Sequence, residues 1–327
     1  MIITRTPYRI SLGGGGTDLP SYYGNFGGFL ISGAINKYMY IIVKERFEET
    51  FRVSYSKTEI VKDVESITHP IVREALKLVG IDSYLEIISI GDIPSSSGLG
   101  SSGSFTVGLL NALFHYLGQE LDPMSLAEKA FHIESELLGE PVGKQDQYIA
   151  AFGNVISMDI NQQGRVLVDG EFMSESNIRA LEDNLVFFYT GIQRSASDIL
   201  KDQSQSAKKK DEEVIQSMHE IKEIGKECYK RFGSGDIDWF GHSLHKHWIM
   251  KKKISGKMSS EFIDNCYNQA RNCGALGGKI MGAGGGGFLM FYKRGDKTSL
   301  IESLSSMGLK KFNFSISRTG SERLYDL

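Results

Sequence analysis

The chain of 327 residues is long enough for a large core and two domains. Hydrophobic residues make up 41% and charged residues 24%, and the formal net charge of −3 argues against a general nucleic-acid binder, which would carry a basic excess. The sequence lacks a membrane-length apolar run and a signal-peptide layout at its start, and its three cysteines lie far apart, so we expect a cytoplasmic, enzyme-sized protein with reduced thiols.

The first half of the chain mixes strands and helices. Runs rich in Ile, Val, Tyr and Phe predict strands at 37–47, 51–55 and 84–90. Apolar residues at helical spacing predict helices at 66–79, at 102–117 and, after the start signal Asp122-Pro123, from there to about residue 138. The segments 153–160 and 164–168 are typical of a short hairpin.

In the second half the sequence turns polar around 170–183 and loses its periodicity, which predicts domains at 1–180 and 181–327. A strand is predicted at 184–189, followed by helices at 195–205, 211–231, 236–250 and 259–273. The chain then predicts a strand at 287–292, a helix at 297–307 and a strand at 311–316. Strands interleaved with helices in two halves indicate an α+β fold.

The segment 94–104 (PSSSGLGSSGS) lies between a predicted strand and a predicted helix. Small residues let a backbone approach a ligand closely, and a helix N-terminus presents unpaired N–H groups and the positive end of its dipole to an anion. A flexible linker is the alternative, but regular structure brackets the segment tightly. We therefore predict a phosphate-binding loop, with candidate contacts at Ser96, Ser97, Gly98, Leu99, Gly100, Ser101, Ser102, Gly103 and Ser104.

The same loop contains Gly98-x-Gly100-x-x-Gly103, the pattern of dinucleotide-binding proteins. That interpretation, an NAD-linked oxidoreductase, needs a second strand ending in an acidic residue about 20 residues on. Here the helix runs through 118–122 into another predicted helix, which counts against it. A Walker A loop is excluded because Gly-Lys-Ser/Thr is missing.

The segment 7–18 (PYRISLGGGGTD) places Arg9 on a short strand before a glycine turn that presents Thr17 and Asp18. Arginine supplies forked donors and aspartate accepts from hydroxyls, so this pair suits a polyhydroxylated or phosphorylated ligand. A surface salt bridge beside a turn is the alternative.

Two acidic residues, Glu134 late on a helix and Asp146 after a Pro/Gly turn, could reach one site if the turn folds back. One would hold a metal ion and the other would orient or deprotonate a nucleophile, although either could be a solvated carboxylate. The glycine-dense segment 277–288 predicts a close approach, either of two chain segments or of a loop and a ligand, with a purely structural turn as the alternative.

Histidines at 242, 245 and 247 form His-x-x-His-x-His on a predicted helix. Because His247 falls on a different helix face and no Cys or acid completes the set, we do not predict a zinc site. Arg194, between a strand end and a helix start, is a candidate for an anion pocket.

The segments 7–18, 94–104 and 277–288, in this order, resemble the GHMP kinases, the superfamily of galactokinase, homoserine kinase, mevalonate kinase and phosphomevalonate kinase. The resemblance spans nearly the whole chain. It implies an N-terminal domain like the second domain of ribosomal protein S5, which binds ATP along the central loop, and a ferredoxin-like C-terminal domain. It also implies that Ser102 and Glu134 hold Mg²⁺, that Asp146 is catalytic, and that Arg9 and Asp18 lie beside the sugar.

Longer stretches, at 9–23, 190–200, 246–259 and 275–288, are similar to the heptose 7-phosphate kinase branch. That branch phosphorylates the anomeric (C1) hydroxyl of D-glycero-D-manno-heptose 7-phosphate to the 1,7-bisphosphate, on the route to GDP-heptose. The galactokinase signature Gly-Glu-His-Thr-Asp reads GGGTD at 14–18, which counts against galactose. An L-fucose or galactose kinase, and a non-catalytic ATP-binding regulator, remain alternatives.

The resemblance suggests a mechanism in which N–H groups of 98–103 bind the β- and γ-phosphates and Asp146 accepts the proton of the sugar hydroxyl. Arg9 would neutralise charge on the transferring group. Gly16 and Thr17 join Arg9, Asp18 and Asp146 as candidate sugar contacts. The 7-phosphate needs a cationic pocket, for which Lys144 and Arg194 are candidates, with Lys251 and Arg318 behind them. We expect a sugar phosphate as the substrate, with ATP and Mg²⁺ as cofactors and neither nucleic acid nor a membrane as a partner, and leave a homodimer open.

Overall fold

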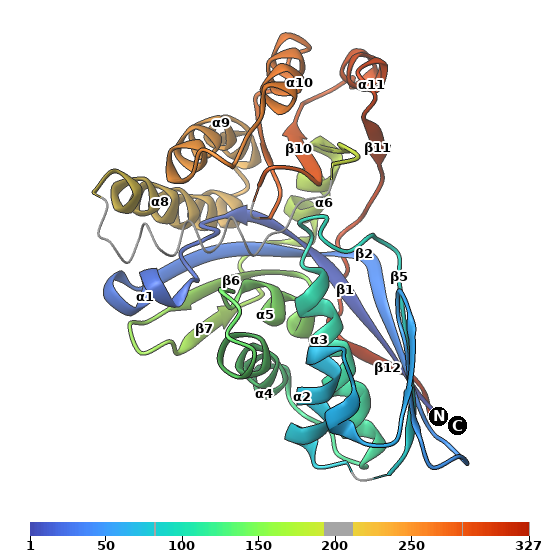
Figure 1. Cartoon of the computed structure of the whole chain (residues 1–327). Coiled ribbons are helices and arrows are strands. Elements are labelled where there is room, and N and C mark those ends of the chain that lie inside the picture. The colour runs from blue at the N-terminus through green and yellow to red at the C-terminus, as the bar shows by residue number, and fades with distance from the viewer. Residues whose placement is uncertain (82, 193–211, 283, 327) are drawn as a thin grey trace.

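The computed structural model describes residues 1–81, 83–192, 212–282 and 284–326. Within these residues the chain forms two β-sheets, with helices between and around them (Figure 1). One sheet has eight strands and the other has four. The predicted α+β class is confirmed.

The larger sheet is built on two long antiparallel strands, β1 (Ile2–Gly13) and β2 (Gly28–Glu45). Strand β2 pairs with β6 along its first six residues and with β5 along its last seven, so the sheet divides around it. The remaining strands are β3 (Phe51–Ser54), β4 (Thr58–Val61), β5 (Leu85–Gly91), β6 (Val155–Ile160), β7 (Val166–Asp169) and β12 (Glu322–Asp326). Only the pairing of β3 with β5 is parallel in the described sheet.

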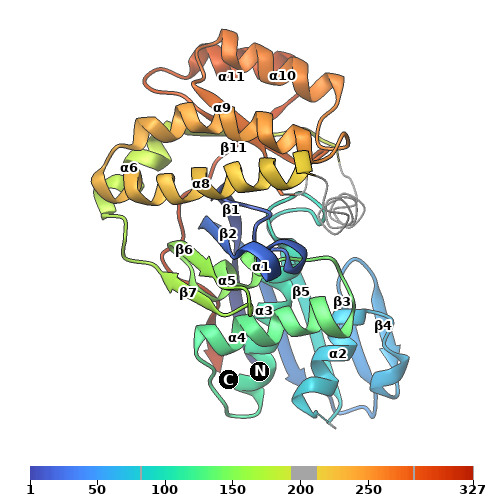
Figure 2. The ribbon, with the colours of Figure 1, turned by 90° about the vertical axis from the view of Figure 1, so that its left-hand side faces the viewer.

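Helices on one face of this sheet surround α3 (Ser101–Tyr116), which packs against both long strands (Figure 2). Twelve consecutive residues of α3 are buried, because neighbouring helices cover the sides that the sheet leaves open. These neighbours are α2 (Pro70–Val79), α4 (Pro123–Phe131) and α5 (Gln145–Phe152). Two short helical segments, η1 (Val64–Ser66) and the π-helix η2 (His132–Leu137), adjoin α2 and α4, and α1 (Pro20–Phe26) connects β1 to β2.

The smaller sheet has the strand order β11-β8-β10-β9 with every pairing antiparallel. Its strands are β8 (Leu185–Tyr189), β9 (Gly277–Ile280), β10 (Phe288–Tyr292) and β11 (Lys310–Phe312). Along the chain they follow the order strand, helices, strand, strand, helix, strand, which with this spatial order is the ferredoxin-like arrangement predicted for the C-terminal half.

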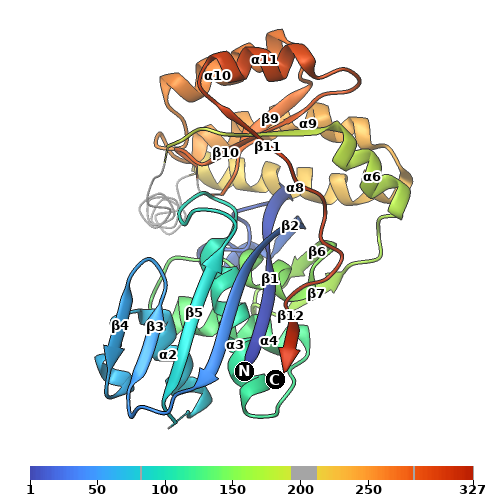
Figure 3. The ribbon, with the colours of Figure 1, turned by 90° about the vertical axis from the view of Figure 1, so that its right-hand side faces the viewer.

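Helices cover both faces of the smaller sheet (Figure 3). On one face α10 (Glu261–Asn272) and α11 (Thr298–Ser306) bury Phe188 and Phe291. On the other, α8 (Glu212–Ser234) and α9 (Ile237–Ile254) lie between the two sheets, since α8 contacts β1 and β2 while α9 contacts β9 and β10. The two halves therefore share a continuous core.

Most predicted elements are present with ends shifted by a few residues, although β2 begins at Gly28 and not at the predicted residue 37. The extent of β1 and the elements α1, α5, β4, β9 and β12 were not predicted. The loss of periodicity expected at 170–183 was wrong for α6 (Glu175–Asn184), which Ser174 caps by accepting a bond from Asn177. Only Ile178 and Leu181 of α6 are buried, so its apolar pattern is weak.

The predicted helix at 195–205 lies outside the described residues. The last strand, β12, pairs with β1 of the larger sheet, so the chain returns to the first half after completing the second. The division at residue 180 stays a prediction. Among the helices of the described residues, none has the length and apolarity that crossing a bilayer requires.

Candidate active site

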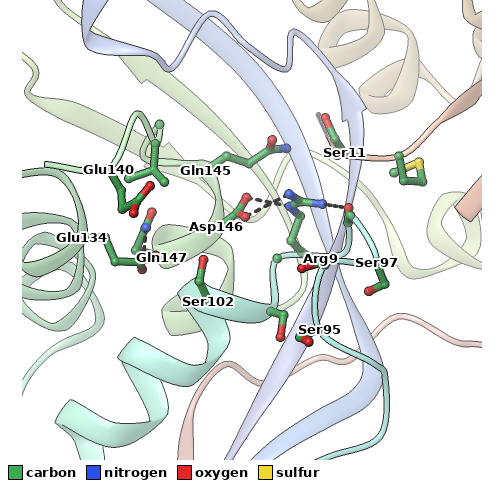
Figure 4. A pocket seen from close by; sticks show the side chains of 18 of the residues that line it. Arg9, Ser11, Ser95, Ser97, Ser102, Glu134, Glu140, Gln145, Asp146 and Gln147 are labelled. Atoms are coloured by element: carbon green, nitrogen blue, oxygen red, sulfur yellow. Dashed lines mark hydrogen bonds and ion pairs between the residues drawn. The ribbon is translucent and has the colours of Figure 1, made fainter. Parts of the chain in front are cut away.

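A large cleft, with a cavity volume of about 1010 Å³, lies where the two sheets approach each other. One wall comes from β1, the loop before α3 and the start of α5, and the other from α9 and β9. The predicted phosphate loop, the segment 7–18 and the two acidic residues 134 and 146 all reach this cleft (Figure 4).

The loop before α3 ends in two glycines with left-handed backbone, Gly98 (φ 83°) and Gly100 (φ 80°). Gly100 occupies the N-cap position, where no side chain bonds to the first-turn N–H groups of α3. A Cβ at Gly100 would lie 2.8 Å from Cγ of Arg9. The helix N-terminus therefore keeps its donors for a ligand, and its partial positive charge faces the cleft.

The loop residues divide into those that line the cleft and those that build it. The lining residues are Ser95, Ser96, Ser97, Gly98, Gly100, Ser101 and Ser102. Leu99 is buried in the core, and the Ser104 hydroxyl donates to the carbonyls of Pro7 and Gly100. The Ser97 hydroxyl is buried without a partner in the described structure, so it is a donor suited to an anion in the loop.

Arg9 and Asp146 form a two-point ion pair in the cleft, shown by the dashed lines in Figure 4. Nε of Arg9 donates to Oδ1 of Asp146 at 2.7 Å, and Nη2 donates to Oδ2 at 2.9 Å. The third donor, Nη1, bonds to the Gly98 carbonyl at 2.6 Å. The Arg9 side chain is 8% exposed and the Asp146 side chain is 25% exposed, so the carboxylate remains open to a ligand. One arginine thus fixes both the acid and the phosphate loop.

Asp146 lies in the first turn of α5, close against the first turn of α3. A Cβ at Gly103 would lie 2.7 Å from Cβ of Asp146 and 2.9 Å from its carbonyl carbon. Gly103 does not line the cleft, so its contribution to the site is this close approach of two helices.

The Asp18 carboxylate holds the glycine turn against the start of α5. Oδ1 accepts from the N–H of Gly16 and Oδ2 from the N–H of Gln145, each at 3.0 Å. Burial raises the pKa of Asp18, and its neighbour Asp146 acts in the same direction. Thr17 is fully buried and donates to the carbonyls of Gly14 and Phe29, so it builds the turn and does not line the cleft.

Glu134 projects from the π-helix η2 into the cleft and is 2% exposed. Its carboxylate accepts hydrogen bonds from Nε2 of Gln147 at 2.9 Å and from the Ser102 hydroxyl. Burial raises the pKa of Glu134 to about 7, against the opposite effect of these bonds. Local π-helical turns often occur at functional sites, and this one brings a carboxylate to the N-terminus of α3.

The surroundings of Glu134 fit a magnesium ion that a nucleotide brings with it. The Oε1 atom of Gln147 is buried without a partner in the described structure, beside the Glu134 carboxylate and the Ser102 hydroxyl. Among the described residues, no group of three or more His, Cys, Asp and Glu could hold a metal by itself. Mg²⁺ is commonly held by one or two carboxylates together with substrate phosphates and water, so this sparse oxygen set is of the right kind.

The basic residues proposed from sequence for the distal phosphate have different surroundings. Both carboxylate oxygens of Glu128 accept from Nζ of Lys144, at 2.5 and 2.8 Å, and Lys144 does not line the cleft. Arg318 pairs with the exposed Glu175. Arg194 lies outside the described residues. Of Lys144, Lys251 and Arg318, which the structure describes, only Lys251 lines the cleft.

Sequence reasoning missed two buried basic residues in the cleft, Lys279 and His247, each 2% exposed. The difference in helix face that argued against a zinc motif is what turns His247 inward, while Nδ1 of His245 bonds to Tyr267 elsewhere. Lys279 lies in the glycine-dense segment 277–288. There the predicted meeting of two chain segments is confirmed, because a Cβ at Gly282 would lie 2.6 Å from Cα of Gly98.

At the end of the cleft away from Lys279, apolar and aromatic side chains form the lining, including Met39, Tyr55, His69, Ile93 and Phe105. The rings of His69 and Phe105 are stacked with centroids 4.8 Å apart. Such a surface suits a flat heterocycle.

The dinucleotide-binding interpretation of the loop fails on topology. A Rossmann unit returns from its first helix to a strand parallel to the first. Here α3 leads to α4, η2 and α5, and the next strand, β6, pairs antiparallel with β2 and not with β5.

Comparison with known proteins finds a family match for each half of the chain. Residues 66–154 match the model of the GHMP kinases N terminal domain, and residues 214–309 match that of the GHMP kinases C terminal domain. The chain is 31% identical to a D-glycero-alpha-D-manno-heptose 7-phosphate kinase of Campylobacter jejuni, over 98% of this chain and 97% of that protein. It is 25% identical to a galactokinase of Pyrococcus furiosus, over 96% and 95%.

Solved structures agree in fold. A D-glycero-D-manno-heptose 1-phosphate kinase from Bacteroides thetaiotaomicron superposes with a TM-score of 0.83 at 24% identity, covering all of both chains. A Lactococcus lactis galactokinase complexed with galactose gives a TM-score of 0.78 at 19% identity, over 99% of this chain and 95% of that one.

Proposed function

This chain belongs to the GHMP kinases, and we propose that it phosphorylates the anomeric (C1) hydroxyl of D-glycero-D-manno-heptose 7-phosphate with ATP, giving the 1,7-bisphosphate. The observation that carries the proposal is the position of Asp146. Its carboxylate is held by Arg9 between the uncapped N-terminus of α3 and the turn at 14–18. A phosphate donor and a sugar hydroxyl can meet at that point.

The triphosphate of ATP would lie along residues 96–102, where the first N–H groups of α3 and the Ser97 hydroxyl are the donors. Its base would lie against the surface that includes Tyr55, His69 and Phe105. Phosphoryl transfer depends mainly on positioning and on neutralising charge, and the loop contributes both.

Asp146 would orient the sugar hydroxyl and accept its proton as the new bond to the γ-phosphorus forms and the bond from that phosphorus to the bridging oxygen of the departing ADP breaks. The two bonds from Arg9 fix the plane of the carboxylate and leave its remaining lone pairs for the hydroxyl. Arg9 also binds the Gly98 carbonyl. The same side chain therefore fixes the loop that would hold ATP and the carboxylate that would hold the sugar hydroxyl.

Ser102 and Glu134 would hold Mg²⁺ beside the phosphate loop. The ion would supply positive charge to the β- and γ-phosphate oxygens. The Glu134 carboxylate is buried and ready to receive a cation, while Gln147 fixes its orientation through Nε2.

Heptose 7-phosphate is proposed as the acceptor on the strength of the Campylobacter jejuni relative, which matches over nearly the full length of both chains. The glycines at 15 and 16 support it, because they leave the sugar side of the cleft without the Glu and His of the galactokinase signature. An L-fucose or galactose kinase is the alternative within the same family.

The test is a substrate panel with purified protein, ATP and Mg²⁺, comparing heptose 7-phosphate, L-fucose, galactose and mannose by kcat/KM. We expect heptose 7-phosphate to be preferred, and phosphorus NMR of the product to show a second phosphate at C1. A higher kcat/KM for an unphosphorylated sugar, or phosphorylation at another carbon, would overturn the proposal.

A further inference from the structure

We propose that Lys251, Lys279 and His247, the basic cluster, bind the phosphate group that the sugar substrate carries at the end remote from its reacting hydroxyl. The inference rests on the proposed function and names the site that selects a phosphorylated sugar.

The basic cluster comes from two elements that form one wall of the cleft. His247 and Lys251 are one turn apart on α9, and Lys279 lies on β9, which packs against α9. Nζ of Lys279 is 3.2 Å from Nδ1 of His247. All three residues line the cleft.

The partners of the two lysines are neutral. Nζ of Lys279 donates to the Leu12 carbonyl at 3.2 Å, and Nζ of Lys251 donates to the carbonyls of Ile280 and Gly282. In the part of the chain that the structure describes, no carboxylate forms an ion pair with either ammonium. By contrast, Arg9 and Lys144 each pair with an acid.

Placing the buried Lys279 and His247 beside the partly buried Lys251 without an acid disfavours their charged forms in the protein alone. Burial and the neighbouring lysines lower the pKa of His247 well below its usual range, and burial with Lys251 and Arg9 nearby does the same for Lys279. Burial and Arg9 lower the pKa of Lys251 to about 7. A phosphate dianion would supply the missing negative charge and accept from both ammonium groups.

The position of the cluster suits the far end of the sugar. Arg9 and Ser11 alternate on β1 and both line the cleft, with Lys279 bonded to the adjacent Leu12 carbonyl. The Ser11 hydroxyl is buried without a partner in the described structure, and Ser11 is 7% exposed. Between Asp146 and the cluster the lining thus offers an unused hydroxyl, which suits a polyhydroxylated molecule with one end at Asp146 and its phosphate at the lysines.

A structural role is the competing explanation, because Lys251 binds carbonyls at the end of β9 and in the glycine-rich turn, and Lys279 binds the Leu12 carbonyl of β1. The two explanations differ in what a substitution changes. A structural role affects every substrate together, whereas a phosphate site affects only substrates that carry the phosphate.

The experiment uses Lys279→Met and Lys251→Met, with Lys252→Met as the matched control. Lys252 follows Lys251 on α9, pairs with Asp264 and does not line the cleft. Steady-state kinetics are measured with heptose 7-phosphate, with the same sugar lacking the phosphate, and with ATP as the varied substrate. Inorganic phosphate is tested as an inhibitor competitive with the sugar, and circular dichroism checks that each variant is folded.

We expect each cluster variant to raise KM for heptose 7-phosphate by about 10- to 100-fold, the range for losing a hydrogen bond to a charged group. KM for ATP and for the unphosphorylated sugar should stay within about twofold, and competition by inorganic phosphate should weaken in the cluster variants alone. Equal increases in KM for both sugars, or undiminished competition by phosphate, would overturn the inference.

The outcomes separate this inference from the proposed function. If the wild-type protein phosphorylates heptose 7-phosphate at C1 and the variants behave like Lys252→Met, only the basic cluster is refuted. If the wild-type protein accepts only unphosphorylated sugars, both fail. Lys251 is partly exposed, so Lys251→Met keeps the test valid should Lys279→Met fail to fold.

Discussion

The two walls of the cleft differ in how their charged side chains are paired. On the wall formed by β1, the phosphate loop and α5, Asp146 is matched by Arg9, and Asp18 by two backbone N–H groups. On the wall formed by α9 and β9, two lysines face the cleft and contact backbone carbonyls and His247, with no acid paired to them among the described residues. Matched charges hold reacting groups in a fixed geometry, whereas unmatched charges favour an ionic ligand, so one wall suits catalysis and the other suits recognition.

We call the wall of β1, the loop and α5 the matched wall, and the wall of α9 and β9 the unmatched wall. The largest effect is expected from removing the acid Asp146 from the matched wall. Asp146→Asn should lower kcat by about 10²- to 10⁴-fold, the usual effect of losing a general base. The affinity for ATP should be nearly unchanged, because the loop and the start of α3 keep their donors. A coupled assay and nucleotide titration would check this, and a variant with near-normal kcat would refute the role of Asp146.

Glu134→Gln should lower the activity of the protein and remove a pH-dependent loss of its stability. We expect kcat to fall by about 10²-fold, because the proposed magnesium ligand is lost. Since burial raises the pKa of Glu134 to about 7, its charge opposes folding as the pH rises through 7. Wild-type stability without Mg²⁺ should therefore fall between about pH 5 and pH 8, by up to roughly 3 kcal/mol, and the variant should lack this decline.

Urea unfolding at the two pH values measures both proteins under the same conditions. A variant that is less stable than the wild type at pH 8 would show that the protein itself stabilises the Glu134 carboxylate, without a bound cation.

Gly103→Ala tests the spacing of the matched wall. The new methyl group would meet Asp146, so α3 and α5 must separate. We expect a loss of about 1–3 kcal/mol in unfolding free energy and a fall in kcat of roughly 10- to 100-fold, since small misplacements of reacting groups are costly. Gly24→Ala is the control, because a Cβ there meets nothing within 4 Å. Equal kinetics for the two variants would contradict the account.

The smallest effect on substrate recognition is expected for Lys144→Met. Its ammonium is already paired with Glu128, outside the cleft lining, so KM for heptose 7-phosphate should stay within about twofold. A KM raised by ten times or more would place the phosphate of the sugar at the matched wall and contradict the division between the two walls.

The sequence predicts the matched wall better than the unmatched one, for a physical reason. The loop at 94–104 is a continuous segment, so its glycines and serines predict phosphate binding from local sequence alone. Arg9 and Asp146 are far apart in the chain, and only the family resemblance brought them together. Lys279 is buried against β1 and α9, and His247 of α9 is buried beside Lys279 of β9. Both depend on tertiary packing that the sequence pattern does not record.

The fold shows the same limit. Helix α3 was predicted because its apolar residues extend over four turns, while β12 is a short terminal strand that forms by pairing with β1. Helix α6 has two buried residues and a polar surface, so its pattern resembles that of a loop.

The most direct test of the central claim is a crystal structure with a non-hydrolysable ATP analogue, Mg²⁺ and heptose 7-phosphate. We predict the γ-phosphate at the start of α3, the C1 hydroxyl against Asp146, and the 7-phosphate against Lys251 and Lys279. A triphosphate bound away from residues 96–102, or a sugar whose C1 hydroxyl lies remote from Asp146, would contradict it.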